Sequence, residues 1–218
     1  MIRVPTQAAL VEAIADRLAL KRPVTARRVI AIVGAPGSGK STLAEILAEA
    51  LAEFIDPEAV CVVPMDGFHL DNRLLEPAGL LSVKGAPATF DVAGLACMLG
   101  RIAADDAPVY LPWFDRRMDL ARAGALEVRS QHRLILVEGN YLLLQRQGWH
   151  ELGQHFDLTI RLDVPWSELR DRLVRRWREH GHELDAAVAR AEANDLPNGR
   201  IVERESAEAH FCFVPTNG

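Results

Sequence analysis

A β-branched apolar stretch, Val29–Val33, leads directly into the glycine-rich string GAPGSGKST at residues 34–42. Apolar residues with helical spacing follow the string, from Leu43 to Phe54. This order predicts a strand over 29–33, a glycine-rich turn, and a helix over about 40–54. A strand, such a turn and a helix form the context in which this string becomes a phosphate-binding loop.

Each residue type in the string suits a bound phosphate. Glycine lets the backbone adopt conformations closed to other residues and brings N–H groups near phosphate oxygens. The following helix adds free N–H groups and its positive dipole end. Lys40 offers a charge to the β- and γ-phosphates, and Ser41 offers a hydroxyl to Mg²⁺. A glycine-rich turn that only caps a helix is the alternative. The predicted phosphate-contacting residues are Gly34, Ala35, Pro36, Gly37, Ser38, Gly39, Lys40, Ser41 and Thr42.

Length and composition indicate one ordinary globular domain over residues 1–218. The net charge of −5 does not favour nucleic acid as a partner. The three cysteines are far apart, form no metal pattern, and favour a reducing compartment. No apolar stretch is long enough to span a membrane, and the chain begins with an amphipathic pattern rather than a secretory one. We therefore expect a cytoplasmic protein without membrane or nucleic-acid partners; a homodimer stays open.

Short apolar runs alternate with helical patterns along the chain, which predicts a parallel sheet covered by helices on both faces. Residues 64–90 are expected to be irregular, 109–111 a short extended piece, and 112–132 a charged loop. The long stretch 64–132 would lie over the strand ends that hold the phosphate site. The expected strands are 29–33, 60–63, 134–137, 158–162 and 210–214, and the expected helices are about 6–20, 40–54, 91–104, 166–180 and 183–194.

Two of these strands end in a carboxylate. Glu138 follows the strand 134–137, at the position of an acid that reaches Mg²⁺ directly or through water. Asp66 follows the strand 60–63, where a carboxylate beside a γ-phosphate can accept the proton of an attacking hydroxyl. An ordinary strand end and an Asp-Gly turn are the structural alternatives. We predict Ser41 and Glu138 as metal ligands and Asp66 as a general base.

These residues carry a resemblance to the phosphoribulokinase/uridine kinase family of phosphate-loop kinases, with pantothenate kinase as a further relative. Several segments look most similar to bacterial proteins named as fructose-transport-system kinases, a name that says little about the substrate. The matching segments are GAPGSGKST, Asp66–His69, Thr89–Asp91, Pro108–Tyr110 with Phe114–Asp115, Leu136–Gly139 and Leu169–Arg176, and those most like the bacterial proteins are Met65–His69, Lys84–Asp91 and Asn194–Asn198.

The resemblance implies a fold and a reaction. The fold is the α/β three-layer sandwich of phosphate-loop NTPases, with a five-stranded parallel sheet in the order 2-3-1-4-5. The reaction is transfer of the γ-phosphoryl group of ATP to a hydroxyl of a small metabolite such as a sugar, a nucleoside or a vitamin precursor. An acceptor-binding insertion over about 64–132 and a lid over about 166–182 are part of this expectation. The implied acceptor-binding residues are Asp91, Tyr110 and Arg172.

The lid also has independent support from helical spacing. Leu169, Leu173 and Trp177 repeat every four residues and form one apolar stripe. Arg172, Arg175 and Arg176 lie on another side, from which they could neutralise charge near a triphosphate. We predict Arg175 and Arg176, together with Lys40, as catalytic. A solvated charged face balanced by neighbouring acids is the alternative.

Parts of the chain depart from the uridine kinases. His69 stands where those enzymes carry tyrosine, and their Thr-His pair is replaced by Phe114-Asp115-Arg116-Arg117. His69 either holds the acceptor or packs in a loop, and Arg117 either contacts the acceptor or forms a surface ion pair with Asp115. The segment 194–200 either approaches the adenine base or forms a polar turn with Pro197 and Gly199 as breakers.

A regulatory NTPase or GTPase is the rival from another functional class. Asp91–Gly94 fits a switch pattern, but it falls in an expected helix, and the chain has no Asn-Lys-x-Asp segment for reading guanine. A kinase-shaped scaffold without turnover is the third possibility, which the set of Lys40, Ser41, Asp66 and Glu138 disfavours.

Overall fold

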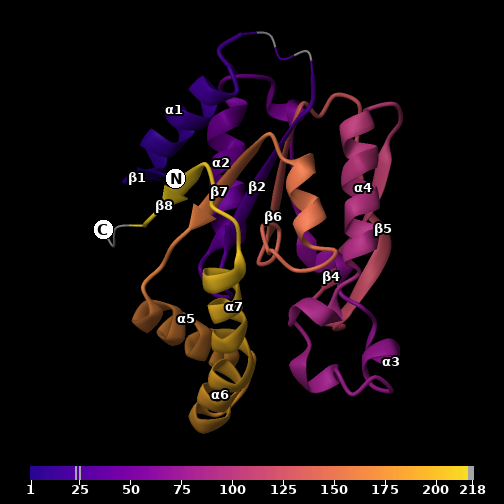
Figure 1. Cartoon of the computed structure of the whole chain (residues 1–218), viewed down its shortest axis with the longest axis vertical. Coiled ribbons are helices and arrows are strands. Elements are labelled where there is room, and N and C mark those ends of the chain that lie inside the picture. The colour runs from indigo at the N-terminus through magenta and orange to yellow at the C-terminus, as the bar shows by residue number, and fades with distance from the viewer. Residues whose placement is uncertain (23, 25, 216–218) are drawn as a thin grey trace.

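A computed structural model describes residues 1–22, 24 and 26–215 of the chain (Figure 1). Within these residues a six-stranded sheet has the strand order β1-β8-β7-β2-β6-β3, and every neighbouring pair is parallel. This is the α/β arrangement of a phosphate-loop NTPase, as predicted. The strands are β1 (Ile2–Val4), β2 (Arg28–Gly34), β3 (Val60–Pro64), β6 (Leu134–Gly139), β7 (Leu158–Leu162) and β8 (Phe211–Phe213).

The five predicted strands occur in the predicted order, but the count of five is wrong. The additional strand, Ile2–Val4, pairs with β8 and extends one edge of the sheet. This strand has three residues, fewer than the roughly four to eight over which alternation indicates a strand, so it carries no such signal in the sequence. Its pairing with the far end of the chain is a tertiary contact.

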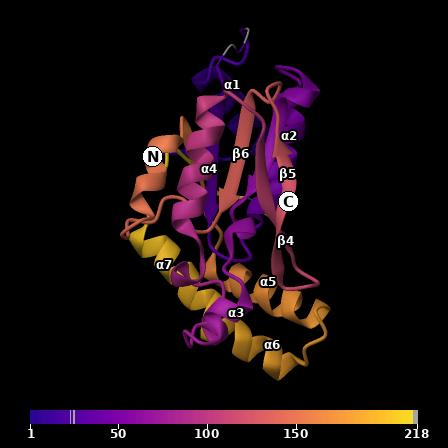
Figure 2. The ribbon, with the colours of Figure 1, turned by 90° about the vertical axis from the view of Figure 1, so that its right-hand side faces the viewer.

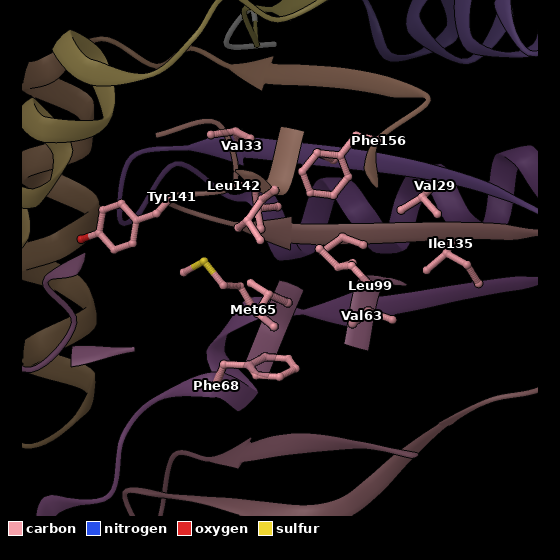
Figure 3. Close-up of a cluster of buried hydrophobic side chains, with 14 of the residues drawn as sticks. Val29, Val33, Val63, Met65, Phe68, Leu99, Ile135, Tyr141, Leu142 and Phe156 are labelled. Atoms are coloured by element: carbon pink, nitrogen blue, oxygen red, sulfur yellow. The ribbon is translucent and has the colours of Figure 1, made fainter. Parts of the chain in front are cut away.

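Alternation along the central strand sends its side chains to two separate cores. Val29 and Val33 of β2 pack with α4 (Val92–Ala104) and the segment 141–156. Ile30 and Ile32 pack with α1 (Gln7–Arg17) and α2 (Lys40–Ala52). Figure 3 shows part of the first core, in which Leu99 of α4 lies among side chains from the strands. Because both faces of the sheet are covered by helices, the central strands are mostly apolar, as the continuous runs indicated.

The helices agree with the helical patterns, with one correction. The side chain of Thr6 accepts a hydrogen bond from the Ala9 N–H and so caps the first helix, and Asp91 caps the fourth helix in the same way on Gly94. For 194–200 the alternative of a polar turn is wrong, because a π-helical turn at Ala191–Asp195 leads directly into the last helix. The helices are α1 (Gln7–Arg17), α2 (Lys40–Ala52), α3 (Asn72–Leu75), α4 (Val92–Ala104), α5 (Trp166–Glu179), α6 (Leu184–Arg190) and α7 (Leu196–Glu205).

Pro197 therefore starts a helix instead of breaking one, since proline fits the first helical turn. Gly199 lies inside α7, at a position where a side chain would press on the Trp166 ring and on Ala35 of the phosphate loop. The glycine permits close packing of α7 against the loop.

The charged loop expected over 112–132 is also wrong. Residues Val109–Asp115 (β4) and Leu120–Val128 (β5) form an antiparallel two-stranded ribbon separate from the main sheet. One side of the ribbon buries Val109, Leu111 and Val128, while its other side faces solvent and carries the charges that concealed the strands. Figure 1 shows the ribbon beside α4, and Figure 2 shows α3, α5 and α6 gathered at one end of the molecule.

In the described part of the chain, none of the helices combines the length and hydrophobicity needed to cross a membrane.

Candidate active site

The register of the central strands gathers three predicted residues at one edge of the sheet. Glu138 of β6 lies opposite Ile32 of β2 on one side and opposite Pro64 of β3 on the other. Gly34, which opens the phosphate loop, and Asp66 each follow two residues beyond these partners. Since parallel strands end at the same edge, the loop and Asp66 flank Glu138.

The phosphate loop has the backbone of an anion cradle. Gly37 and Gly39 have φ angles of 76° and 94°, which residues with side chains rarely adopt. Gly39 is the N-cap of α2 and provides no side-chain hydrogen bond, so the first N–H groups of that helix are left for a ligand. The Ser38 hydroxyl is buried and has no hydrogen-bond partner among the described residues. This arrangement fits a phosphate group.

Lys40 and Glu138 are buried at the floor of the site, and the exposed Ser41 lies beside them. Ser41 Oγ donates a 3.1 Å hydrogen bond to Glu138 Oε1, and Lys40 Nζ donates to the Ala35 carbonyl at 3.0 Å. Burial lowers the pKa of Lys40, and the negative charge of Glu138 opposes this shift. Burial likewise raises the pKa of Glu138, against the attraction of Lys40. A phosphate and a cation would relieve both burial penalties.

Asp66 lies in a short 3₁₀ turn after β3 and meets an arginine that the sequence did not single out. Arg116 Nη2 donates a 2.6 Å hydrogen bond to Asp66 Oδ2. Gly67 makes this meeting possible, since a Cβ there would collide with the Pro112 carbonyl of β4. The charges of Asp66 and Arg116 both act on Lys40 and on Glu138, so all four belong to one cluster.

Two further predicted acceptor residues lie beside Asp66. His69 Nδ1 is 2.8 Å from the Asp66 carbonyl, and its ring packs between Phe90 and Phe114 at centroid distances of 4.1 and 4.6 Å. Burial lowers the pKa of His69, which favours a neutral ring. The Asp91 N–H donates to the Phe68 carbonyl at 2.8 Å, so the start of α4 adjoins the Asp66 turn. The switch-like pattern at Asp91 thus caps a helix and does not end a core strand.

The arginines of α5 have different surroundings. Arg172 donates to the Ser38 carbonyl of the phosphate loop at 2.8 Å and pairs with Glu168, so it touches the loop rather than the Asp66 turn. Arg176 pairs with Asp195 at 2.9 Å, and its charge acts on Lys40. Arg175 is exposed. The helix therefore lies over the phosphate loop, while an acceptor role for Arg172 stays a prediction.

Tyr110 and Arg117 lie on the ribbon. Tyr110 is 57% exposed near the start of β4, opposite Glu127 of β5. The backbone N–H of Arg117 donates to Asp115 Oδ1, and the Arg117 residue is exposed. The adjacent Arg116, not Arg117, contacts Asp66. Acceptor roles for Tyr110 and Arg117 stay predictions.

The described residues contain no group of three or more His, Cys, Asp or Glu that could enclose a metal. Magnesium bound with a nucleotide needs only one or two protein ligands, because phosphate oxygens and water complete its coordination. The paired Ser41 hydroxyl and Glu138 carboxylate fit that requirement.

Comparison with known proteins identifies the family. The chain superimposes on the crystal structure of a protein named "putative fructose transport system kinase" from Silicibacter sp. TM1040 with a TM-score of 0.88 and 49% identity, covering 95% of this chain and 98% of that one. It is 35% identical over 186 residues to "Putative uridine kinase C227.14" of Schizosaccharomyces pombe, over 82% of this chain and 79% of the relative. The chain belongs to the phosphoribulokinase/uridine kinase family of phosphate-loop kinases.

A more distant kinase and a broader family model agree with this assignment. The chain is 34% identical over 161 residues to a pantothenate kinase of Nitrobacter hamburgensis, a match that spans 69% of this chain and 50% of that enzyme. A family model described as an AAA domain matches residues 30–195, which include the phosphate loop, Asp66 and Glu138. The predicted family resemblance, including the pantothenate kinase relationship, is confirmed.

Proposed function

We propose that this member of the phosphoribulokinase/uridine kinase family transfers the γ-phosphoryl group of ATP to a hydroxyl of a small metabolite, with Asp66 as the general base. The observation that carries the proposal is the position of the Asp66 turn beside Glu138 and the phosphate loop. A hydroxyl held between Asp66 and a γ-phosphate would have its base and its electrophile on opposite sides.

The reaction would proceed as one in-line displacement. Asp66 accepts the proton of the acceptor hydroxyl, whose oxygen forms a bond to the γ-phosphorus while the bond to the β–γ bridging oxygen breaks and ADP leaves. Lys40 and the N–H groups of the loop stabilise the charge on the transferring group. Arg116 holds one oxygen of Asp66, which leaves the other oxygen to face the acceptor.

Ser41 and Glu138 would hold Mg²⁺, which neutralises charge on the phosphate oxygens when it is bound. Arg176, kept near Lys40 by Asp195, would add positive charge from the lid. Residues 64–132 would supply the acceptor site, because His69, Asp91 and the ribbon all adjoin the Asp66 turn.

The test is an ADP-coupled assay of purified protein with MgATP and a panel of uridine, pantothenate, fructose and further nucleosides and sugars. Acceptor-dependent ADP release with a phosphorylated product in mass spectrometry supports the proposal. ADP release that ignores every acceptor would favour an NTPase instead.

Asp66→Asn tests the role of the base. We expect turnover to fall by about two to four decades, the usual contribution of a positioned base, while affinity for the ATP analogue AMP-PNP is retained. Asp71→Asn is the matched control, because Asp71 is an exposed acid of the same segment that pairs with Arg73. Normal turnover in Asp66→Asn would remove Asp66 from the mechanism.

A further inference from the structure

Two segments that the sequence singled out, 84–91 and 194–198, meet in the folded chain. Asn194 Nδ2 donates a 2.9 Å hydrogen bond to the Lys84 carbonyl, and Asn198 Nδ2 donates a 3.0 Å hydrogen bond to Asn194 Oδ1. The Tyr141 hydroxyl holds the next carbonyl, that of Gly85, at 2.7 Å. Both ends of the Asn194 amide therefore form hydrogen bonds. The nitrogen bonds to residues 84–91, here called the acceptor segment, and the oxygen bonds to α7.

On the nucleotide side, Asn194 belongs to the π-helical turn that joins α6 to α7. The next residue, Asp195, is buried and accepts hydrogen bonds from Arg176 and Trp177 of α5. That same helix touches the phosphate loop through the hydrogen bond from Arg172 to the Ser38 carbonyl. The π turn is thus connected to the loop through one helix.

On the acceptor side, the Lys84 side chain continues the connection. Its ammonium donates to Asn72 Oδ1 at 2.7 Å and to the Asp119 carbonyl at 2.9 Å, and it lies 5.2 Å from the centroid of the Phe114 ring. Asp119 and Phe114 flank Arg116 in the sequence, the residue that contacts Asp66. Lys84 therefore anchors the turn between β4 and β5 that carries Arg116.

We propose that Asn194 is a positioning residue. It connects the phosphate loop and α5, on the nucleotide side, to residues 84–91 and the β4–β5 turn, on the acceptor side. The latch is the hydrogen bond from Asn194 to Lys84. A nucleotide in the phosphate loop restrains α5 and the π turn, and the latch passes this restraint to residues 84–91 and to the β4–β5 turn. The inference rests on the proposed function only in requiring a nucleotide at the loop.

Physical reasons favour a latch at this place. Hydrogen bonds weaken steeply when their distance or angle departs from the ideal, so a small shift of the π turn would release the Lys84 carbonyl. Single π-helical turns within helices often occur at functional sites, where they change the direction of the side chains. Here the turn directs Asn194 outward to the acceptor segment and Asp195 inward to α5.

The test is hydrogen–deuterium exchange measured by mass spectrometry, with and without Mg²⁺ and AMP-PNP. In the unaltered protein we expect the nucleotide to slow exchange in the loop, in α5, in residues 84–91 and in the β4–β5 turn. Asn194→Ala should lose the slowing in the last two regions and keep it in the first two. Asn194→Asp removes the donor but keeps an oxygen for Asn198, and it should show the same loss.

Glu192→Ala is the matched control, because Glu192 is exposed in the same π turn and pairs with Arg170 instead of the acceptor segment. It should keep the nucleotide-dependent slowing in all four regions. Equal slowing at 84–91 in the unaltered protein and in Asn194→Ala would overturn the latch, as would its absence from the unaltered protein. Failure of AMP-PNP to bind would contradict the proposed function itself, which separates the two failures.

Discussion

Arg116 and Asp66, 50 residues apart in the sequence, are joined by a 2.6 Å hydrogen bond between guanidinium and carboxylate. The Arg116 side chain is 62% exposed and that of Asp66 is 25% exposed, so the pair lies at the mouth of the site with Lys40 and Glu138 behind it. At such exposure the pair contributes little to stability. Its consequence is the orientation of Asp66.

Replacing Arg116 by methionine should lower kcat by about tenfold to a hundredfold, the loss that follows when a reacting group is misplaced by about 1 Å. KM for ATP should stay nearly unchanged, because in the described part of the chain Arg116 bonds to Asp66 and not to the phosphate loop. Steady-state kinetics with an acceptor from the panel measures both constants. Arg116→Lys should recover part of the rate, and Arg73→Met, which removes an exposed arginine that pairs with Asp71, should leave it intact; equal losses in the two methionine variants would rule out a specific role for Arg116.

Replacing Lys40 by methionine should weaken AMP-PNP binding and lower kcat by about 10²- to 10³-fold, the usual effect of removing one preorganised charge-stabilising group. Lys40 is buried beside Glu138, and residues 34–42 contain no other lysine that could replace its charge. Calorimetric titration gives the affinity, and the ADP-coupled assay gives the rate. An unchanged titration would count against nucleotide binding at this loop.

Gly67→Ala should separate the ribbon from the Asp66 turn, since the new methyl group collides with the backbone carbonyl of Pro112, which cannot rotate away. We expect a loss of about 1–3 kcal/mol in the free energy of unfolding, typical of overpacking, and a larger loss in turnover than in AMP-PNP affinity. Urea denaturation measures the first quantity. Gly153→Ala is the control, because nothing lies within 4 Å of a Cβ at that position; similar losses in both variants would contradict the explanation.

Cys61 should make the protein less stable at high pH. Burial raises the pKa of its thiol from 9.0 to about 11. Well below pH 9 the thiol is protonated in the folded and in the unfolded state, so it leaves the free energy of unfolding independent of pH there. Between pH 9 and 11 the unfolded chain ionises first, and the folded state loses up to about 3 kcal/mol relative to it. Denaturation at several pH values should show a shallower decline for Cys61→Ala than for the unaltered protein. Cys97→Ala, which removes an exposed thiol, provides the comparison.

Much of the fold was predictable because its signals are local. The apolar runs of the central strands, the glycine loop and the helical spacing of α2 and α5 each lie within one short window. The ribbon of β4 and β5 was missed because its outward side is charged and its two strands pair with each other instead of with the main sheet. The edge strand Ile2–Val4 was missed because its partner strand, β8, lies at the other end of the chain.

The sequence by itself determined the phosphate loop, the parallel sheet and the position of Asp66 and Glu138 at strand ends, since strand register and loop length bring such residues to one edge. Only the tertiary structure decided that Arg116, and not the neighbouring Arg117, meets Asp66, and that Asn194 meets Lys84. Adjacent arginines in an exposed turn have the same local pattern. Which of them turns toward the site depends on the docking of β4 against Gly67, a contact between segments far apart in the chain.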